Sequence, residues 1–220
     1  VAVIKDGEII AVESSLKQKS HSENLNVFVQ DCLRNVSLQL NDVDIFAVGQ
    51  GPGSFTGIRV AANAGKSFAY AYKKPLVTID SLTLLAAPVR TSKRVLSIIN
   101  AYKNMVYLGL FESSADSEPK FLHGPIAIPV LHLHSLINEE VLVVGDGYST
   151  YQQYLPPELA SLMKRDLQYA DHPTAETLGL LAEKRAKLNQ TIEWNSYTPL
   201  YIRASEAEES KRGIVITPLK

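Results

Sequence analysis

A glycine-rich loop stands between an apolar run and a long helical pattern, and it limits the folds open to this chain more than any other segment. Residues 44–48 have the pattern of a short buried strand, and residues 57–72 have the spacing of a helix. The loop between them reads Gly51-Pro52-Gly53-Ser54-Phe55-Thr56-Gly57. A buried strand that passes through a glycine turn into a helix is a unit of α/β proteins.

The same loop is a candidate anion or nucleotide site. Backbone N–H groups at a helix N-terminus attract anions, and glycines let a ligand approach the backbone. The loop lacks the Gly-Lys-Ser/Thr ending of a Walker A loop and the third glycine of a dinucleotide motif. The candidate residues are Gly51, Gly53, Ser54, Thr56 and Gly57. The alternative is that the glycines only make a sharp turn.

Strand and helix patterns alternate along the rest of the chain. Asp6-Gly7 separates two β-rich runs, 1–5 and 8–13, and predicts a two-residue hairpin. Residues 94–100 and 106–112 predict a second hairpin. This alternation favours an α/β protein with mixed sheets flanked by helices.

Further helices follow from caps and apolar spacing. Ser20 and Glu23 form a capping-box pattern, and the apolar stripe after it reaches Leu40. Two more helices are predicted at 82–89 and 173–188. A boundary near residue 92 then gives two lobes, 1–92 and 93–220.

The predicted helix 57–72 is apolar on two faces. One face is made of six residues, Ile58, Ala61, Ala62, Gly65, Ala69 and Tyr72. The second face contains Val60, Ala64, Phe68 and Ala71. A helix that is apolar on both faces is buried on both. The second face therefore packs either inside its own lobe or on a partner chain.

Composition excludes several classes of protein. The formal net charge is −1 over 220 residues, which argues against a large independent nucleic-acid surface. One cysteine, Cys32, rules out a disulfide within the chain and favours a cytoplasmic protein. No run approaches the roughly 20 apolar residues of a membrane span. Cys32 lies on an apolar helical stripe, so we expect it in the core.

Groups able to do chemistry are sparse. The five histidines include no His-x-x-x-His pair, and His132 and His134 alone are too few ligands for a metal. Asp80 and Asp146 follow predicted strands, where catalytic acids occur, but turn and capping roles fit equally well. We therefore predict no catalytic residue, no metal site and no tightly bound cofactor.

Several stretches in register resemble the TsaB (YeaZ) family over essentially the whole chain. They are His21-Ser22-Glu23, Gly51 to Arg59, Pro75-Leu76-Val77, Ser81-Leu82, Val143 to Gly147 and Pro199 to Arg203. The resemblance implies a two-lobed actin-like ATPase (ASKHA) fold, with helix 173–188 packing back on the N-terminal lobe. It also implies a non-catalytic subunit that supports threonylcarbamoyl transfer to the adenosine beside the tRNA anticodon.

The resemblance implies partners as well. The catalytic paralogue TsaD and the ATPase TsaE are the expected partners, with ATP or ADP in the assembled complex, tRNA contacted indirectly and a homodimer when the chain is isolated. The pairing surface of the family is built from the first two helices. The residues expected there are Val27, Phe28, Asp31, Val60, Ala64, Phe68 and Ala71.

The chain also departs from the family. Relatives begin with a strand that ends in Asp-Thr-Ser, whereas this sequence starts at Val1 inside a strand pattern, so we expect an earlier natural start. Nucleotide binding therefore stays open. An Asp-Ala-Arg-like turn of the family is Asn100-Ala101-Tyr102 here. The alternative function is an ATP-binding phosphotransferase or ATPase that uses Asp146 or Asp80; a peptidase would need a nucleophile–base pair that the sequence does not offer.

Overall fold

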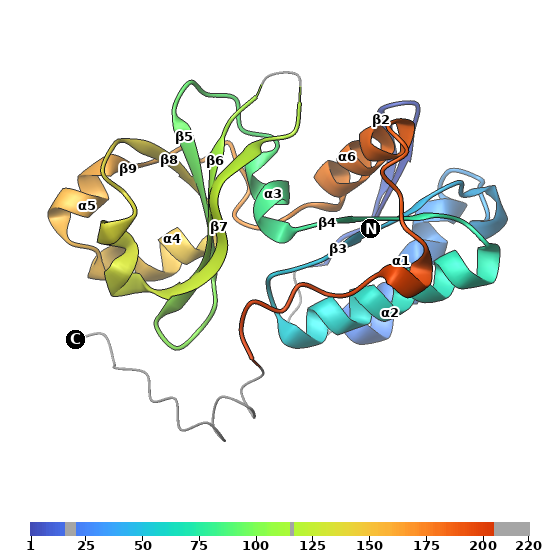
Figure 1. Cartoon of the computed structure of the whole chain (residues 1–220). Helices are drawn as coiled ribbons and strands as arrows, with labels where there is room; N and C mark the ends of the chain where they lie inside the picture. The colour runs from blue at the N-terminus through green and yellow to red at the C-terminus, as the bar shows by residue number, and fades with distance from the viewer. Residues whose placement is uncertain (16–20, 115–116, 205–220) are drawn as a thin grey trace. The chain divides into compact units, whose positions relative to one another are not determined.

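The computed structural model describes residues 1–15, 21–114 and 117–204, with the backbone alone described for 21–23. The chain divides into two compact units. The first unit comprises Val1–Asp80 and Thr174–Leu200, and the second comprises Ser81–Pro173 and the chain from Tyr201 (Figure 1). The side chains of the predicted capping box, Ser20 and Glu23, lie outside the described part.

The first unit begins with the predicted hairpin. Strands β1 (Ala2–Lys5) and β2 (Glu8–Val12) pair antiparallel. Asp6 and Gly7 join them with φ angles of 53° and 83°, as a two-residue turn with a left-handed backbone requires. The sequence therefore predicts this hairpin correctly.

A parallel pair of strands carries the long helix of this unit. Strand β3 (Phe46–Gly49) pairs with β4 (Leu76–Ile79), and α2 (Phe55–Tyr72) connects them. Four residues of the predicted face of α2 are buried, Ile58, Ala62, Gly65 and Ala69, whereas Ala61 and Tyr72 of that face are half-buried. Gly65 lets α2 approach β3 closely, because a Cβ there would lie 2.1 Å from Cγ2 of Val48.

The C-terminal part of the first unit covers these strands. Helix α6 (Ala175–Lys187) packs against β1 and β4, and the Thr174 side chain caps it by accepting from the Thr177 N–H. The segment after α6 pairs with β4 through Leu76 and Ile192, and η4 (Trp194–Ser196) packs on α2. Within this unit α6 lies on one side of the strands and α1 and α2 on the other (Figure 1).

Helix α1 (His21–Arg34) ends earlier than its apolar stripe predicted. Ser37 has a φ of 56°, and the Leu38 N–H bonds back to the Leu33 carbonyl, which closes the helix. Leu40 then starts the short 3₁₀ helix η1 (Leu40–Asp42) instead of continuing the stripe. Cys32 is fully buried, which confirms that it is a core residue.

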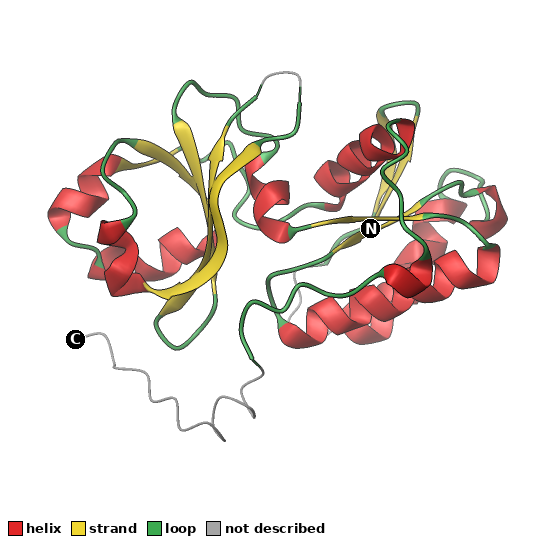
Figure 2. Ribbon diagram, viewed as in Figure 1, coloured by secondary structure: helices red, strands yellow, loops and turns green. Residues whose placement is uncertain are grey.

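The second unit is built on a five-stranded sheet in the order β7-β6-β5-β8-β9 (Figure 2). Its strands are β5 (Arg94–Asn100), β6 (Met105–Glu112), β7 (Lys120–Pro129), β8 (Val141–Val144) and β9 (Met163–Arg165). The β5–β6 hairpin agrees with the predicted hairpin of residues 94–100 and 106–112. Strand β7 was not predicted, because Gly124-Pro125 interrupts its pattern.

Both faces of this sheet are buried. Val95 and Phe111 pack under α3 (Ser81–Ala86) on one face. Leu96 and Ile98 point into a second cluster, which contains Tyr151. Helix α4 (Asp146–Tyr151) contributes Tyr151 to that cluster, and α5 (Pro157–Leu162) contributes Leu159. The short 3₁₀ helix η3 (Gln152–Tyr154) lies between them in the chain. Successive side chains of β5 thus enter opposite layers, so the strand is almost continuously apolar.

The two neighbouring histidines lie outside the strands. His132 and His134 are in the 3₁₀ helix η2 (Val130–Ser135), where both are exposed. The second unit starts at Ser81, not near residue 93, because α3 packs on β5.

Among the described residues, no helix is both long and apolar enough to cross a membrane.

Candidate functional site

The glycine loop is occupied largely by its own chain. Gly51 has a φ of 93°, and a Cβ there would lie 2.7 Å from the Ile58 side chain and 3.2 Å from the Leu200 carbonyl oxygen. The Gln50 backbone carbonyl accepts from the Leu200 N–H at 2.9 Å. The amide side chain of Gln50 donates to the Thr198 carbonyl. Gly51 is therefore required by the turn and by the close passage of the C-terminal segment.

The rest of the loop starts the helix. The Ser54 hydroxyl accepts from the Gly57 N–H at 3.3 Å, which makes Ser54 the N-cap of α2. Thr56 is exposed, and a Cβ at Gly53 would meet no atom within 4 Å. Capping and turn formation thus account for Gly51 and Ser54. The open space at Gly53 leaves room for a ligand, and the fold itself gives no reason for this glycine.

The α1–α2 face is the second candidate site. It consists of Val27, Phe28, Asp31, Val60, Ala64, Phe68 and Ala71. Helices α1 and α2, which carry these residues, contact each other within the first unit. Val27 is 49% exposed, Ala71 is exposed, and Val60 and Ala64 are half-buried.

Two members of this face already have partners within the chain. Phe68 stacks on Phe46 with ring centroids 5.6 Å apart, and Asp31 pairs with Arg34 at 2.8 Å. Phe68 is thus partly explained by packing inside its own unit. Val60, Ala64, Ser67 and Ala71 remain as a row of small side chains along α2 with spacings of four, three and four residues. This is the seam spacing that a second helix needs for close packing.

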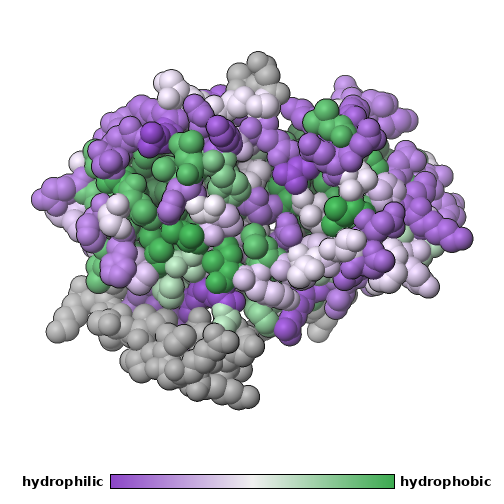
Figure 3. Space-filling model, viewed as in Figure 1, coloured by the Kyte–Doolittle hydropathy of each residue, from purple (hydrophilic) through white to green (hydrophobic). Residues whose placement is uncertain are grey.

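Hydropathy alone does not single out this face. On the side seen in Figure 3, hydrophobic residues reach the surface of both units among hydrophilic ones. The distinguishing property of the α1–α2 face is therefore the regular spacing of small residues on a straight helix.

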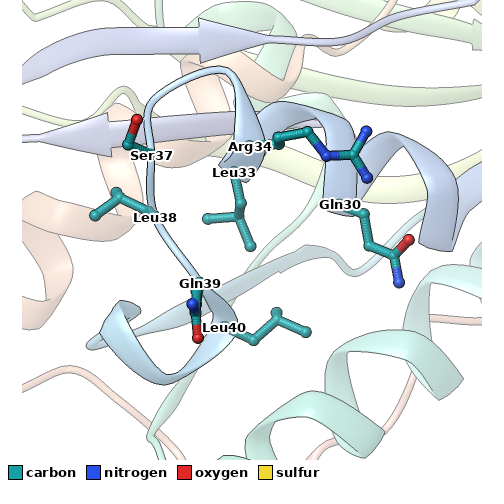
Figure 4. A pocket seen from close by; sticks show the side chains of 7 residues that line it. All are labelled: Gln30, Leu33, Arg34, Ser37, Leu38, Gln39 and Leu40. Carbon is teal, nitrogen blue, oxygen red and sulfur yellow. The ribbon is translucent and has the colours of Figure 1, made fainter.

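A cavity of about 500 Å³ opens where α1 ends (Figure 4). Its lining is Gln30, Leu33, Arg34, Ser37, Leu38, Gln39 and Leu40. It shares no residue with the glycine loop or with the α1–α2 face. Its wall combines apolar and polar groups: the side chains of Leu33 and Leu40 lie beside glutamine amides and the Arg34 guanidinium. That guanidinium is already paired with Asp31. Sequence reasoning missed it, because it forms where the chain leaves the predicted helix.

Asp146 belongs to a hydrogen-bond network in the second unit. Its carboxylate accepts from the Asn100 N–H at 2.9 Å, and the Asn100 side-chain oxygen accepts from the Tyr151 hydroxyl at 3.0 Å. Gly145 and Gly147 bring the start of α4 against the backbone of β5, which puts the carboxylate within reach. Asp146 thus fixes the end of β5, which is the turn role that the sequence left open. Asp80 belongs to the first unit.

The pKa of the Asp146 carboxyl is raised. Burial is the main cause; the Asn100 hydrogen bond opposes it, and the charge of Asp171 raises the pKa further. Because the folded pKa exceeds the unfolded one, the protonated form stabilises the fold. That contribution is complete below the ordinary value of 3.8 and is lost as the pH rises through the folded pKa.

We therefore expect two substitutions of Asp146 to differ. Asp146→Asn keeps the acceptor for the Asn100 N–H, so its stability relative to the wild type should increase as the pH rises from below 3.8 to neutral. Asp146→Ala removes the acceptor and should lower the free energy of unfolding by about 1 kcal/mol. Urea unfolding at several pH values measures both. Equal pH dependence for the wild type and the Asn variant would show that the carboxyl titrates normally.

In the described part of the chain, no group of three or more His, Cys, Asp or Glu side chains is arranged to hold a metal ion.

Comparison with known proteins identifies the family. The family model of TsaD, tRNA N6-adenosine threonylcarbamoyltransferase, matches residues 12–211. The chain belongs to this family. TsaD itself is matched over a shorter stretch: the enzyme of Staphylococcus haemolyticus is 30% identical over 98 residues, which cover 37% of this chain and 29% of that protein.

TsaB proteins match over most of the chain. The TsaB of Haemophilus influenzae is 27% identical over 92% of this chain and 88% of its own length, and that of Escherichia coli is 26% identical over 97% and 93%. The solved structure of YeaZ from Pseudomonas aeruginosa aligns with a TM-score of 0.74 at 25% identity, covering 91% of this chain and 92% of that one. The predicted resemblance to TsaB is confirmed, and the mixed-sheet α/β architecture agrees with the predicted actin-like fold.

Proposed function

We propose that this chain takes part in the biosynthesis of tRNA threonylcarbamoyladenosine as a non-catalytic subunit that pairs with TsaD. The TsaB relatives carry the name of this pathway, and their similarity extends over nearly the full chain. The proposal assigns no chemistry to the chain. The catalytic step, the transfer of a threonylcarbamoyl group from its adenylate to tRNA, belongs to TsaD.

The α1–α2 face carries this proposal. A row of small residues that are exposed or half-buried on an 18-residue helix allows another helix to approach closely, and Val27 adds exposed apolar area. A helix pair on one chain meeting a helix pair on the other would make a compact four-helix contact. The same geometry supports a homodimer of the isolated chain, because the face can pack on a second copy of itself.

TsaE and nucleotide complete the proposed assembly. We place TsaE, ATP or ADP, and tRNA in the complex and not on the isolated chain. The phosphotransferase alternative receives no support from Asp146, because the carboxylate that it would use is bound to the Asn100 N–H. The space at Gly53 is the part of the glycine loop where a phosphate group would fit.

Reconstitution tests the proposal. Purified TsaD and TsaE, unmodified tRNA and threonylcarbamoyl adenylate are combined with and without this chain, and modified adenosine is measured by mass spectrometry. We expect little product without the chain, none from the chain alone, and restored product with all components. Product from the chain alone, or an unchanged rate when the chain is omitted, would contradict the proposal.

A further inference from the structure

An aromatic pair of the first unit joins a core residue to an exposed one. Tyr70 on α2 meets Trp194 on η4 edge to face, with ring centroids 5.0 Å apart. Trp194 is half-buried and packs against the core cluster that contains Ala69 and Tyr197. Tyr70, in contrast, is 64% exposed. Because such a pair favours one arrangement of its rings, Trp194 holds the Tyr70 ring in place at the surface.

Tyr70 borders the row of small residues on α2. Residues three apart are neighbours on a helix surface, so Tyr70 lies beside Ser67. Ser67 and Ala71 are the two exposed members of the row, whereas Val60 and Ala64 are half-buried. Side chains on a helix are directed back over the preceding turn, which here contains Ser67. The tyrosine ring and the exposed half of the row therefore belong to one surface.

The charges beside this ring are mostly engaged within the chain. Lys66, four residues before Tyr70, donates to a backbone carbonyl at 3.1 Å, and Lys74, four residues after it, is in an ion pair. Lys73 remains as a single cation, whereas binding to RNA draws on several phosphate contacts at once. The surroundings of the ring therefore favour contact with a protein over contact with RNA.

We propose that Tyr70, held by Trp194, anchors the contact with TsaD by entering an apolar pocket on that protein. Tyrosine is a common anchor of protein interfaces, and a ring that is already held loses little entropy on binding. Small residues let a partner helix approach α2 closely, and a large ring beside them then meets the same partner.

TsaD is the occupant because Tyr70 continues the surface that the proposed function assigns to TsaD. The inference rests on that function. It adds to the α1–α2 face an aromatic anchor that comes from α2 and η4 together, so the C-terminal part of the first unit takes part in the contact.

Tyr70→Ala should weaken binding to TsaD by at least about tenfold. Tyr70→Phe keeps the ring and should bind within about threefold of the wild type. Tyr154→Ala, which truncates another exposed tyrosine but in the second unit, is the matched control and should bind like the wild type. Affinities are measured by titrating each labelled chain with purified TsaD, and hydrogen exchange of the α2 amides shows whether each variant is folded.

A second measurement uses the wild-type chain and needs no substitution. Trp194 is the one tryptophan of the sequence, so 5-fluorotryptophan gives a single fluorine NMR resonance from this site. TsaD should change the chemical shift of this resonance, because the contact removes water from the aromatic pair. Broadening without a change of chemical shift reports only slower tumbling of the complex and counts against the inference.

The remaining outcomes separate the inference from the proposed function. Wild-type affinity of a folded Tyr70→Ala chain overturns the inference, and if Ala64→Arg loses binding in the same titration, the proposed function stands without it. A resonance that moves with the concentration of the chain alone, and not with TsaD, overturns it in favour of a contact between two copies. A wild-type chain that does not bind TsaD overturns both.

Discussion

Gly145→Ala should unfold the second unit, with a loss of about 3 kcal/mol or more in its free energy of unfolding. Gly145 has a φ of 102°, which an L side chain rarely adopts, and a Cβ there would lie 2.2 Å from the Ile98 carbonyl oxygen. That oxygen belongs to the backbone of β5, a central strand of the sheet, so it cannot move aside like a flexible side chain.

Hydrogen exchange of the β5 and β8 amides measures this loss for the second unit separately. Gly53→Ala is the matched control, because Gly53 lacks a positive φ and a Cβ there would meet no atom within 4 Å. It should change the stability by less than about 0.5 kcal/mol. Native-like protection of β5 and β8 in Gly145→Ala would show that the β8–α4 junction tolerates a side chain and that the described packing is wrong there.

The second large effect concerns assembly. Ala64→Arg should weaken binding to TsaD by about 30-fold or more, while the chain folds normally. Ala64 is half-buried in the isolated chain, so a long side chain can reach solvent there. In a close helix pair the same arginine would be buried without a partner, which is costly.

A charge added elsewhere on the first unit controls for this variant. Leu188 follows α6, on the other side of the strands from α1 and α2, and it is 68% exposed. Leu188→Arg should bind TsaD with wild-type affinity. If both variants lose binding equally, the effect is one of net charge and the α1–α2 face is not the contact.

Local patterns predicted much of the fold. Turn residues and apolar periodicity predict the Asp6-Gly7 hairpin, the β5–β6 hairpin and most of the buried face of α2. In each case the residues that carry the signal lie within a few positions of one another in the sequence. Such features depend on nearest neighbours along the chain, so one sequence carries enough information for them.

Features that depend on distant neighbours were missed. Strand β7 pairs with β6 despite Gly124-Pro125, because tertiary contacts outweigh local propensity. Helix α1 stops at Arg34 although its apolar pattern continues, since the left-handed Ser37 turns the chain.

The candidate sites divide in the same way. The sequence is enough to place Gly51 in a turn and Ser54 at the start of a helix. It does not reveal that Leu200, about 150 positions later, passes beside Gly51. The hydrogen bonds of Asn100 reach Asp146 and Tyr151, about 50 positions later, and no local pattern reveals them.

The most direct test of the account is a sizing experiment at micromolar concentration, with light scattering, on this chain and TsaD from the same organism. Wild type and Leu188→Arg should each elute with TsaD as one complex, and Ala64→Arg should elute apart from TsaD with unchanged hydrogen exchange. A wild-type chain that elutes separately from TsaD, or a folded Ala64→Arg chain that still elutes with it, would contradict the proposal that the α1–α2 face joins the two proteins.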